Sequence, residues 1–207
     1  AKRINGKPYA NWAYNEDGRA LYSEHTDDAE RTEFTYHENG STTVKNELGK
    51  ETTYHFTTIN GKRLPTTMEG HEQGACHAAN KSYTYDELGF QDKVTDWQGN
   101  VTDFDYNDRG LITKQTKAFN TPQAQTSEII WHENQPLPLK TIDDNLTTEF
   151  TYDDNHRVVE KRVTSNQTGD SRVISYTYQL HDNGMLKERR IDGARAGIED
   201  ATVTTFD

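Results

Sequence analysis

The sequence predicts an all-β protein, a meander of antiparallel β-hairpins that together form a long curved sheet. One aromatic phrase recurs along the chain at intervals of roughly 20 to 30 residues, a period typical of repeat architectures. Within each copy, aromatic and polar residues alternate with the period of a half-buried strand. The copies are Tyr14–Gly18, Phe34–Gly40, Tyr83–Gly89, Phe104–Gly110, Phe150–His156 and Tyr176–Leu180.

The composition favours strands over a conventional aliphatic core. Leu, Ile, Val and Phe make up only 34 of 207 residues, and the net charge is -11. Such a combination often indicates disorder. The eleven Tyr and three Trp, with many Thr, instead suit a pleated and half-buried surface. Tyrosine buries a large ring while its hydroxyl finds a partner, so we expect ordered β structure.

Each phrase reads as the first strand of a hairpin. Phe150 and Tyr152 would point to one face of a strand and Thr151 to the other. The phrases then reach Asp, Asn, His or Gly, which build turns. A short strand follows, as at Leu111–Lys117, Arg157–Thr164 and Met185–Ile191.

A second set of turns alternates with the first. Asn46–Lys50 separates strand patterns at Thr42–Lys45 and Glu51–Phe56. Asp96–Asn100 separates Gln91–Thr95 from Val101–Tyr106, and Asp143–Asn145 separates Lys140–Ile142 from Leu146–Tyr152. No stretch of ten or more residues combines helical periodicity with capping residues, so helix should be minor.

Two regions interrupt the rhythm, near residues 59–81 and 121–139. They contain Pro65, Pro136 and Pro138, and proline cannot donate to a strand ladder. We therefore expect inserts or long loops there. Because the repeats resume in phase after each region, residues 1–207 are predicted to form a single array.

The phrases resemble the Rhs/YD-repeat family, whose signature is Tyr-Asp, then Gly after two further residues, then a short apolar strand. The stretch from Tyr85 through Asp86 and Gly89 to Phe90 matches best. In another copy Tyr106 and Gly110 remain but the acid is Asn107, and in a third Tyr152-Asp153 remains but Gly is replaced by His156. The resemblance covers essentially the whole chain.

That resemblance implies a β-sheet strip that coils into a hollow shell, as in bacterial Rhs polymorphic toxins and the related insecticidal toxin complexes and teneurins. In the bacterial members the shell encloses a toxin cargo. The chain would then be a non-enzymatic segment of a larger secreted protein, extracellular or at the bacterial surface. Its partners would be neighbouring repeats of the parent chain and the enclosed cargo. The family's self-cleavage core contains Asp-Pro, a dipeptide that this sequence lacks.

An alternative within the resemblance is a cell-surface adhesion module that binds carbohydrate or a partner protein. Trp97 and Trp131 are the candidate glycan contacts, because exposed aromatic rings stack on sugars. Open strand edges of a cut strip also predict self-association.

The functional residues that the repeat predicts are structural anchors, meaning the residues of each copy that hold the repeats together. The aromatic ring persists in more copies than the acid, which indicates that the ring carries the structure and the acid belongs to the turn. The predicted anchors are Tyr14, Tyr36, Tyr85, Asp86, Gly89, Tyr106, Gly110, Tyr152, Asp153 and Tyr178.

No catalytic, metal or cofactor residues are predicted. Asp103, Asp105 and Asn107 imitate the start of a calcium loop, but its sixth position is Asp108 and its twelfth is Lys114, where the loop needs Gly and Glu. The many acidic residues are expected to form a solvated face rather than a glycosidase pair.

A group near the first insert, His71, Glu72, Cys76 and His77, matches no tetrahedral metal framework, so solvated loop histidines are expected. The single cysteine excludes an internal disulfide and is expected to be a small buried hydrophobic residue.

The charge argues against nucleic acid as a partner, because its binding needs clustered Lys and Arg. Acidity also disfavours anionic membrane surfaces, and no apolar run approaches the roughly 18 residues of a membrane span. The chain begins Ala1-Lys2-Arg3-Ile4 without an apolar signal segment and opens inside a repeat, which is read as an excised piece of a longer polypeptide.

Overall fold

The structure is a computed structural model that describes residues 1–5, 7–26, 29–71, 80–193 and 201–206. Within these residues the chain forms 18 strands and no α-helix, so the all-β prediction is confirmed. Contacts between Cα atoms divide the chain into two compact units, Ala1–Asp103 and Phe104–Asp207. Each unit is described by itself.

The strands are short and follow one another closely along the chain. Unit 1 contains β1 (Lys2–Ile4), β2 (Lys7–Tyr14), β3 (Ala20–His25), β4 (Thr32–Tyr36), β5 (Thr42–Lys45), β6 (Glu51–Ile59), β7 (Lys62–Gly70), β8 (Asn80–Tyr85), β9 (Gln91–Thr95) and the start of β10 (Val101–Tyr106). Unit 2 contains the rest of β10, β11 (Ile112–Lys117), β12 (Gln125–Trp131), β13 (Pro138–Ile142), β14 (Leu146–Tyr152), β15 (Val158–Ser165), β16 (Ser171–Leu180), β17 (Leu186–Asp192) and β18 (Thr202–Thr205).

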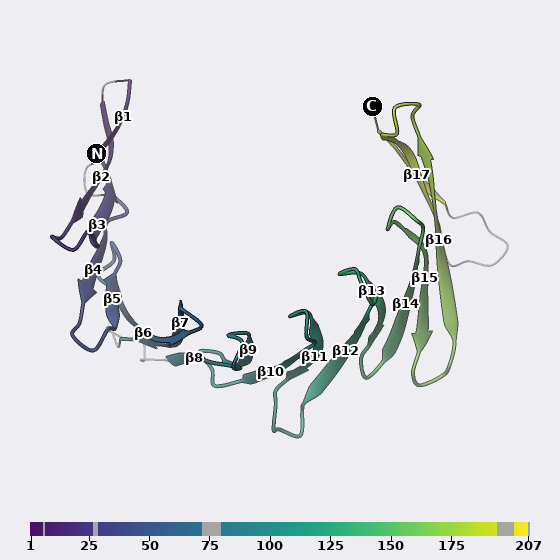
Figure 1. Ribbon diagram of the computed structural model, residues 1–207, viewed down its shortest axis with the longest axis horizontal. Coiled ribbons are helices and arrows are strands. Elements are labelled where there is room, and N and C mark those ends of the chain that lie inside the picture. Colours follow the sequence, from purple (N-terminus) through teal and green to yellow (C-terminus); the bar gives the residue numbers. More distant parts are fainter. Residues whose placement is uncertain (6, 27–28, 72–79, 194–200, 207) are drawn as a thin grey trace. The chain divides into compact units, whose positions relative to one another are not determined.

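All strands belong to one antiparallel sheet, in which neighbours in the chain are hydrogen-bonded neighbours in the sheet. Figure 1 shows this order within unit 1 from β1 to β9 and within unit 2 from β11 to β17. The meander of hairpins predicted from the alternating turns is therefore confirmed. Several predicted bounds agree with the observed ones, including those of β5, β9 and β14.

The period-two alternation also holds. The polar residues Thr35, Thr84 and Thr151 are exposed. The rings on either side of them, such as Phe150 and Tyr152, are half-buried. In these strands one face therefore carries the aromatic side chains and the other presents Thr to solvent. In β2 the pattern is reversed, since Trp12 and Tyr14 are 40% and 58% exposed.

Neither unit contains a conventional hydrophobic core. Contacts between elements are those of successive strands, so no second layer covers either face among the described residues. No hydrophobic side chain is fully buried there. The buried residues are polar, namely Glu24, Ser41, Thr42, Thr53 and Thr116. Cohesion must therefore come from the strand ladders and from contacts between adjacent hairpins.

The two regions predicted as inserts contain strands, which corrects that expectation. β7 lies within 59–81, and β12 with the start of β13 lies within 121–139. Pro65 faces Phe56 and Pro138 faces Trp131 at positions where the register shifts. The register leaves Thr66 and Leu139, the residues that follow the two prolines, without a partner, so both prolines stand at bulges, where a sheet tolerates proline. The single array over 1–207 remains a prediction.

Candidate functional site: a repeated tyrosine anchor

The turns that follow the aromatic phrases share one backbone geometry. The N–H of the first residue donates to the carbonyl of the fifth, and the N–H of the fourth donates to the carbonyl of the first, at 2.8–3.1 Å. The fourth residue has a positive φ, 88° at Gly89 and 63° at His156. Glycine adopts this conformation freely, whereas His156 adopts it with a side chain. The turns are residues 15–19, 37–41, 86–90, 107–111, 153–157 and 181–185.

The acid of the repeat folds the turn. Oδ1 of Asp86 accepts hydrogen bonds from the backbone N–H groups of Leu88 and Phe90, at 3.0 and 2.8 Å. An asparagine oxygen accepts equally well, and Asn107 uses its Oδ1 in the same way toward Arg109 and Leu111. Aspartate is therefore interchangeable with asparagine at this position.

Two turns begin with histidine, and in them the N–H of the fifth residue donates to the side chain of the third residue instead of the first. In the turn that starts at His37, Oδ1 of Asn39 accepts from the N–H of Ser41 at 3.0 Å. In the turn that starts at His181, Asn183 accepts from the N–H of Met185 at 3.0 Å. The acceptor moves from the first to the third residue, so the fifth N–H stays satisfied.

The tyrosine ring connects its hairpin to the preceding one. The hydroxyl of Tyr178 donates to the backbone carbonyl of Val158 at 2.7 Å. Val158 lies directly after the preceding turn and faces Tyr152, the preceding anchor. This hydroxyl thus reaches the start of the strand before its own. The same bond joins Tyr36 to Ala20, Tyr85 to Pro65 and Tyr152 to Pro138, at 2.6–2.8 Å.

Trp131 occupies an anchor position without being a tyrosine. Its ring N–H donates to the carbonyl of Ile112 at 2.7 Å, and it faces Pro138 at a register shift as Tyr152 faces Val158. The indole donates from its edge as the phenol does from its tip. Trp131 thereby joins two hairpins of unit 2 as the anchor tyrosines do. Its contact with a glycan stays a prediction.

Arginine from the preceding turn covers two of the rings. Cζ of Arg157 lies 4.7 Å from the ring centroid of Tyr178, and Cζ of Arg19 lies 5.3 Å from that of Tyr36. Both arginines are fifth residues of their turns, one residue before the carbonyl that accepts the hydroxyl. Arg157 also pairs with Asp153 at 2.7 Å, so turn, arginine and ring form one connected group.

The electrostatics follow from this arrangement. Burial raises the pKa of the Tyr85, Tyr152 and Tyr178 hydroxyls, because the phenolate is poorly solvated there. The side-chain bond from Arg157, followed by backbone N–H bonds, lowers the pKa of Asp153. The neutral phenol and the ionised turn acid are therefore the forms that the fold favours.

The other predicted residues lie as follows. Tyr14 is 58% exposed, and its hydroxyl meets no acceptor among the described residues. Tyr106 directly precedes the turn that Asn107 begins, and Gly110 is the fourth residue of that turn. Trp97 lies second in the turn Asp96–Asn100 and is 45% exposed.

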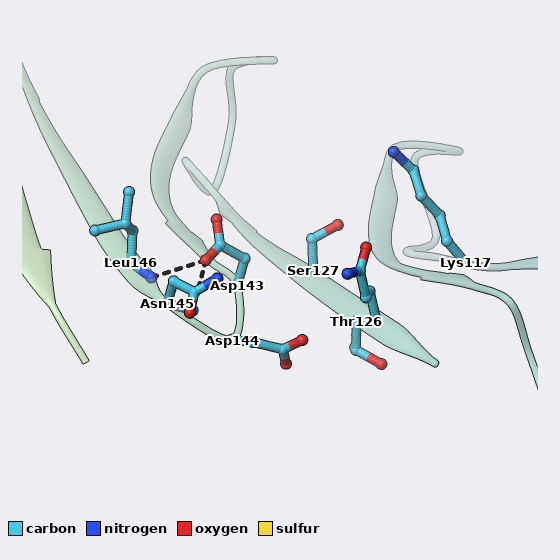
Figure 2. A pocket seen from close by; sticks show the side chains of 8 residues that line it. Lys117, Thr126, Ser127, Asp143, Asp144, Asn145 and Leu146 are labelled. Carbon is cyan, nitrogen blue, oxygen red and sulfur yellow. Dashed lines mark hydrogen bonds between the residues drawn. The ribbon is translucent and has the colours of Figure 1, made fainter. Parts of the chain in front are cut away.

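A shallow polar cleft of about 340 Å³ lies on unit 2 between β11, β12 and the turn before β14. Figure 2 shows Asp143 bonded to the backbone at Asn145 and Leu146, while Lys117 lies on the other side of the cleft in this view. The Asp143 carboxylate therefore serves its own turn. The lining contains no pairing of a nucleophile with a base.

The weaker metal candidates have other partners or lie outside the described residues. Asp103 pairs with Lys93 at 3.1 Å, and His71 bonds to the hydroxyl of Thr53 at 2.8 Å. Glu72, Cys76 and His77 lie outside the described part of the chain. Across the residues that the structure describes, no three His, Cys, Asp or Glu side chains are grouped to hold a metal ion. In the same part, no helix is long and apolar enough to cross a membrane.

Sequence reasoning found the rings and turns but missed the acceptors. Each acceptor is a backbone carbonyl on a different hairpin, which carries no residue signature. For Ala20, Ile112 and Val158 the spacing was a usable signal, since each directly follows a five-residue turn. Pro65 and Pro138 follow no such turn. The role of Trp131 was missed because no Tyr-Asp phrase surrounds it.

Comparison with known proteins shows the fold. No protein-family model and no curated protein matches the chain. The Tc holotoxin pore of Photorhabdus luminescens, with a mutation in TccC3, matches with a TM-score of 0.70 and 10% identity over 96% of this chain. The crystal structures of TcdB2-TccC3 without its hypervariable C-terminal region and of TcdB2-TccC3-TEV match with TM-scores of 0.68 and 0.65, each with 13% identity over 97% of this chain. The chain spans 12% of each matched chain.

Replacing Tyr152 with Phe should lower the free energy of unfolding by about 0.5–1.5 kcal/mol, because it removes one hydrogen bond between hairpins. Tyr14→Phe is the matched control and should have an effect near zero, since that hydroxyl has no acceptor among the described residues. Urea unfolding followed by circular dichroism measures both. Equal losses in the two variants would contradict the anchor role.

Stability should also fall at high pH. The raised pKa of Tyr85, Tyr152 and Tyr178 means that their contribution is complete below the unfolded value of about 10 and is lost as pH rises through the folded values. Urea midpoints measured between pH 8 and 11.5 should decline above pH 10. The decline should be shallower in Tyr152→Phe, and an unchanged slope in that variant would be inconsistent with the assignment.

Proposed function

We propose that this chain is a non-enzymatic structural module, a segment of an Rhs-type β-shell that encloses a toxin cargo and helps to deliver it. The observation that carries the proposal is the bond to the preceding hairpin that four anchor tyrosines and Trp131 make, as from Tyr178 to Val158. The fold likeness to TcdB2-TccC3 and to the Tc holotoxin pore supports it.

The anchor geometry suits a strip that extends without a core. Where an anchor ring bonds to the preceding hairpin, a ladder and a ring bond together fix the two hairpins, so hairpins can be added in series without a second layer. A coiled strip of this kind encloses volume and isolates a cargo until delivery. Its partners would be neighbouring repeats of the parent chain and the cargo, and the parent would act outside the cell or at the bacterial surface.

The absence of convergent chemistry in the described residues supports a structural rather than an enzymatic role. Asp153 and Asp96 have lowered pKa values because each carboxylate accepts hydrogen bonds from its own turn. Open strand edges remain a route to self-association of the isolated chain.

The test uses the complete polypeptide that carries these residues. Electron cryomicroscopy should reveal a closed β-shell with polypeptide density inside, and limited proteolysis should leave the enclosed segment intact until urea unfolds the strips. An open strip whose neighbouring domains are cut at the same rate with and without urea would refute the shell.

A second candidate function is adhesion at a cell surface, and the exposed Trp97 favours it. The indole lies at the tip of a turn, where it is accessible to a sugar ring. Binding on a glycan array that is lost in Trp97→Ala and kept in Leu48→Ala, a change at another exposed turn residue, would support this function. An array without signal for the unchanged chain would eliminate it.

A further inference from the structure

A cleft of about 270 Å³ lies on unit 1 where three hairpin ends meet. It is formed by Arg19 at the end of the turn between β2 and β3, by the turn after Tyr36, and by β6 and β7. Its walls include two aromatic rings, Tyr36 and Phe56, and two guanidinium groups, Arg19 and Arg63. The ring bonds explain Tyr36, and Arg19 covers that ring, but neither feature accounts for the second arginine, Arg63, beside them.

Both guanidinium groups lie over the rings of the cleft. Cζ of Arg63 is 4.0 Å from the ring centroid of Phe56, and Cζ of Arg19 is 5.3 Å from that of Tyr36. A guanidinium held against a ring keeps its N–H edge available for hydrogen bonds. Arg63 uses one Nη2 bond to the backbone carbonyl of Gly40, which fixes the group and leaves other N–H donors free.

The two positive charges are unpaired within the described residues. Neither Arg19 nor Arg63 forms an ion pair with any described residue. No carboxylate lines the cleft, although the chain has a net charge of -11. By contrast, Arg31 pairs with Glu24 and Glu33, and Arg157 pairs with Asp153.

Polar side chains beside the arginines are already ordered. Oδ1 of Asn39 accepts from the hydroxyl of Ser41 at 2.7 Å, and both residues line the cleft. The ligand would therefore meet a fixed polar wall rather than a mobile loop. Guanidinium groups bind carboxylate and phosphate oxygens through short charge-assisted hydrogen bonds.

We propose that this cleft binds a small oxyanion, with Arg19 and Arg63 as its ligands. The group bound is either the carboxylate of an acidic sugar or a free phosphate, since the same N–H edges recognise both. This site is independent of the shell role, because binding would use none of the anchor hydroxyls and no strand edge.

The test is a titration of the 207-residue chain, followed by NMR of the arginine Nε–Hε groups. Sodium glucuronate and inorganic phosphate are the probes, and glucose is the uncharged control. We expect saturable shifts at Arg19 and Arg63 with at least one anion and none with glucose. The anion that causes these shifts identifies the oxyanion as a sugar carboxylate or a phosphate. The absence of shifts with both anions would overturn the proposal.

Variants separate binding from general charge. Arg63→Gln should weaken binding at least tenfold, because a charge-assisted bond is lost, and Arg63→Lys should restore part of it. Arg172→Gln removes the same charge from unit 2 at an exposed site and should leave binding unchanged. If Arg63→Gln fails to fold, Arg19→Gln gives the same comparison. Undiminished binding in a folded Arg63→Gln or Arg19→Gln chain, or an equal loss in Arg172→Gln, would contradict the site.

Discussion

The hydrogen bond from an aromatic ring to a backbone carbonyl in the second strand of the preceding hairpin is the interaction on which this protein depends. A single layer of strands has no core to fix the position of one hairpin against the next. Backbone ladders hold strands together, but a ladder with weak side-chain pattern tolerates slippage. The bond that the hydroxyl of Tyr178 donates can form in only one register, in which Val158 lies opposite the preceding ring. Repeating that bond turns a series of hairpins into one defined sheet.

The Tyr-Asp phrase therefore combines two separable features. The acid closes its own turn, and asparagine at Asn107 or a displaced asparagine at Asn39 does the same. The ring reaches outside the turn, and it needs only a flat apolar body with a donor at its edge, as Trp131 shows. A search for such repeats should weight the aromatic residue and its distance from the preceding turn more heavily than the acid.

The fold was largely predictable, because strand alternation and turn residues are local signals. The predicted bounds of β5, β9 and β14 agree with the observed ones. Proline misled the prediction at Pro65 and Pro138, since sequence does not reveal that both residues stand at β-bulges, where a sheet tolerates proline. The anchor bonds and the pair Arg19 and Arg63 were not predictable either, because they join residues whose proximity depends on the register between hairpins.

Hydrogen exchange tests the central claim most directly, by asking whether one ring stabilises its neighbouring hairpin. In Tyr178→Phe, exchange should accelerate in β16 and also at the start of β15, near Val158, because the lost bond joins the two strands. The amides of β11 and β12 serve as the internal reference and should not change. Acceleration confined to β16 and β17, with β15 unaffected, would contradict the account.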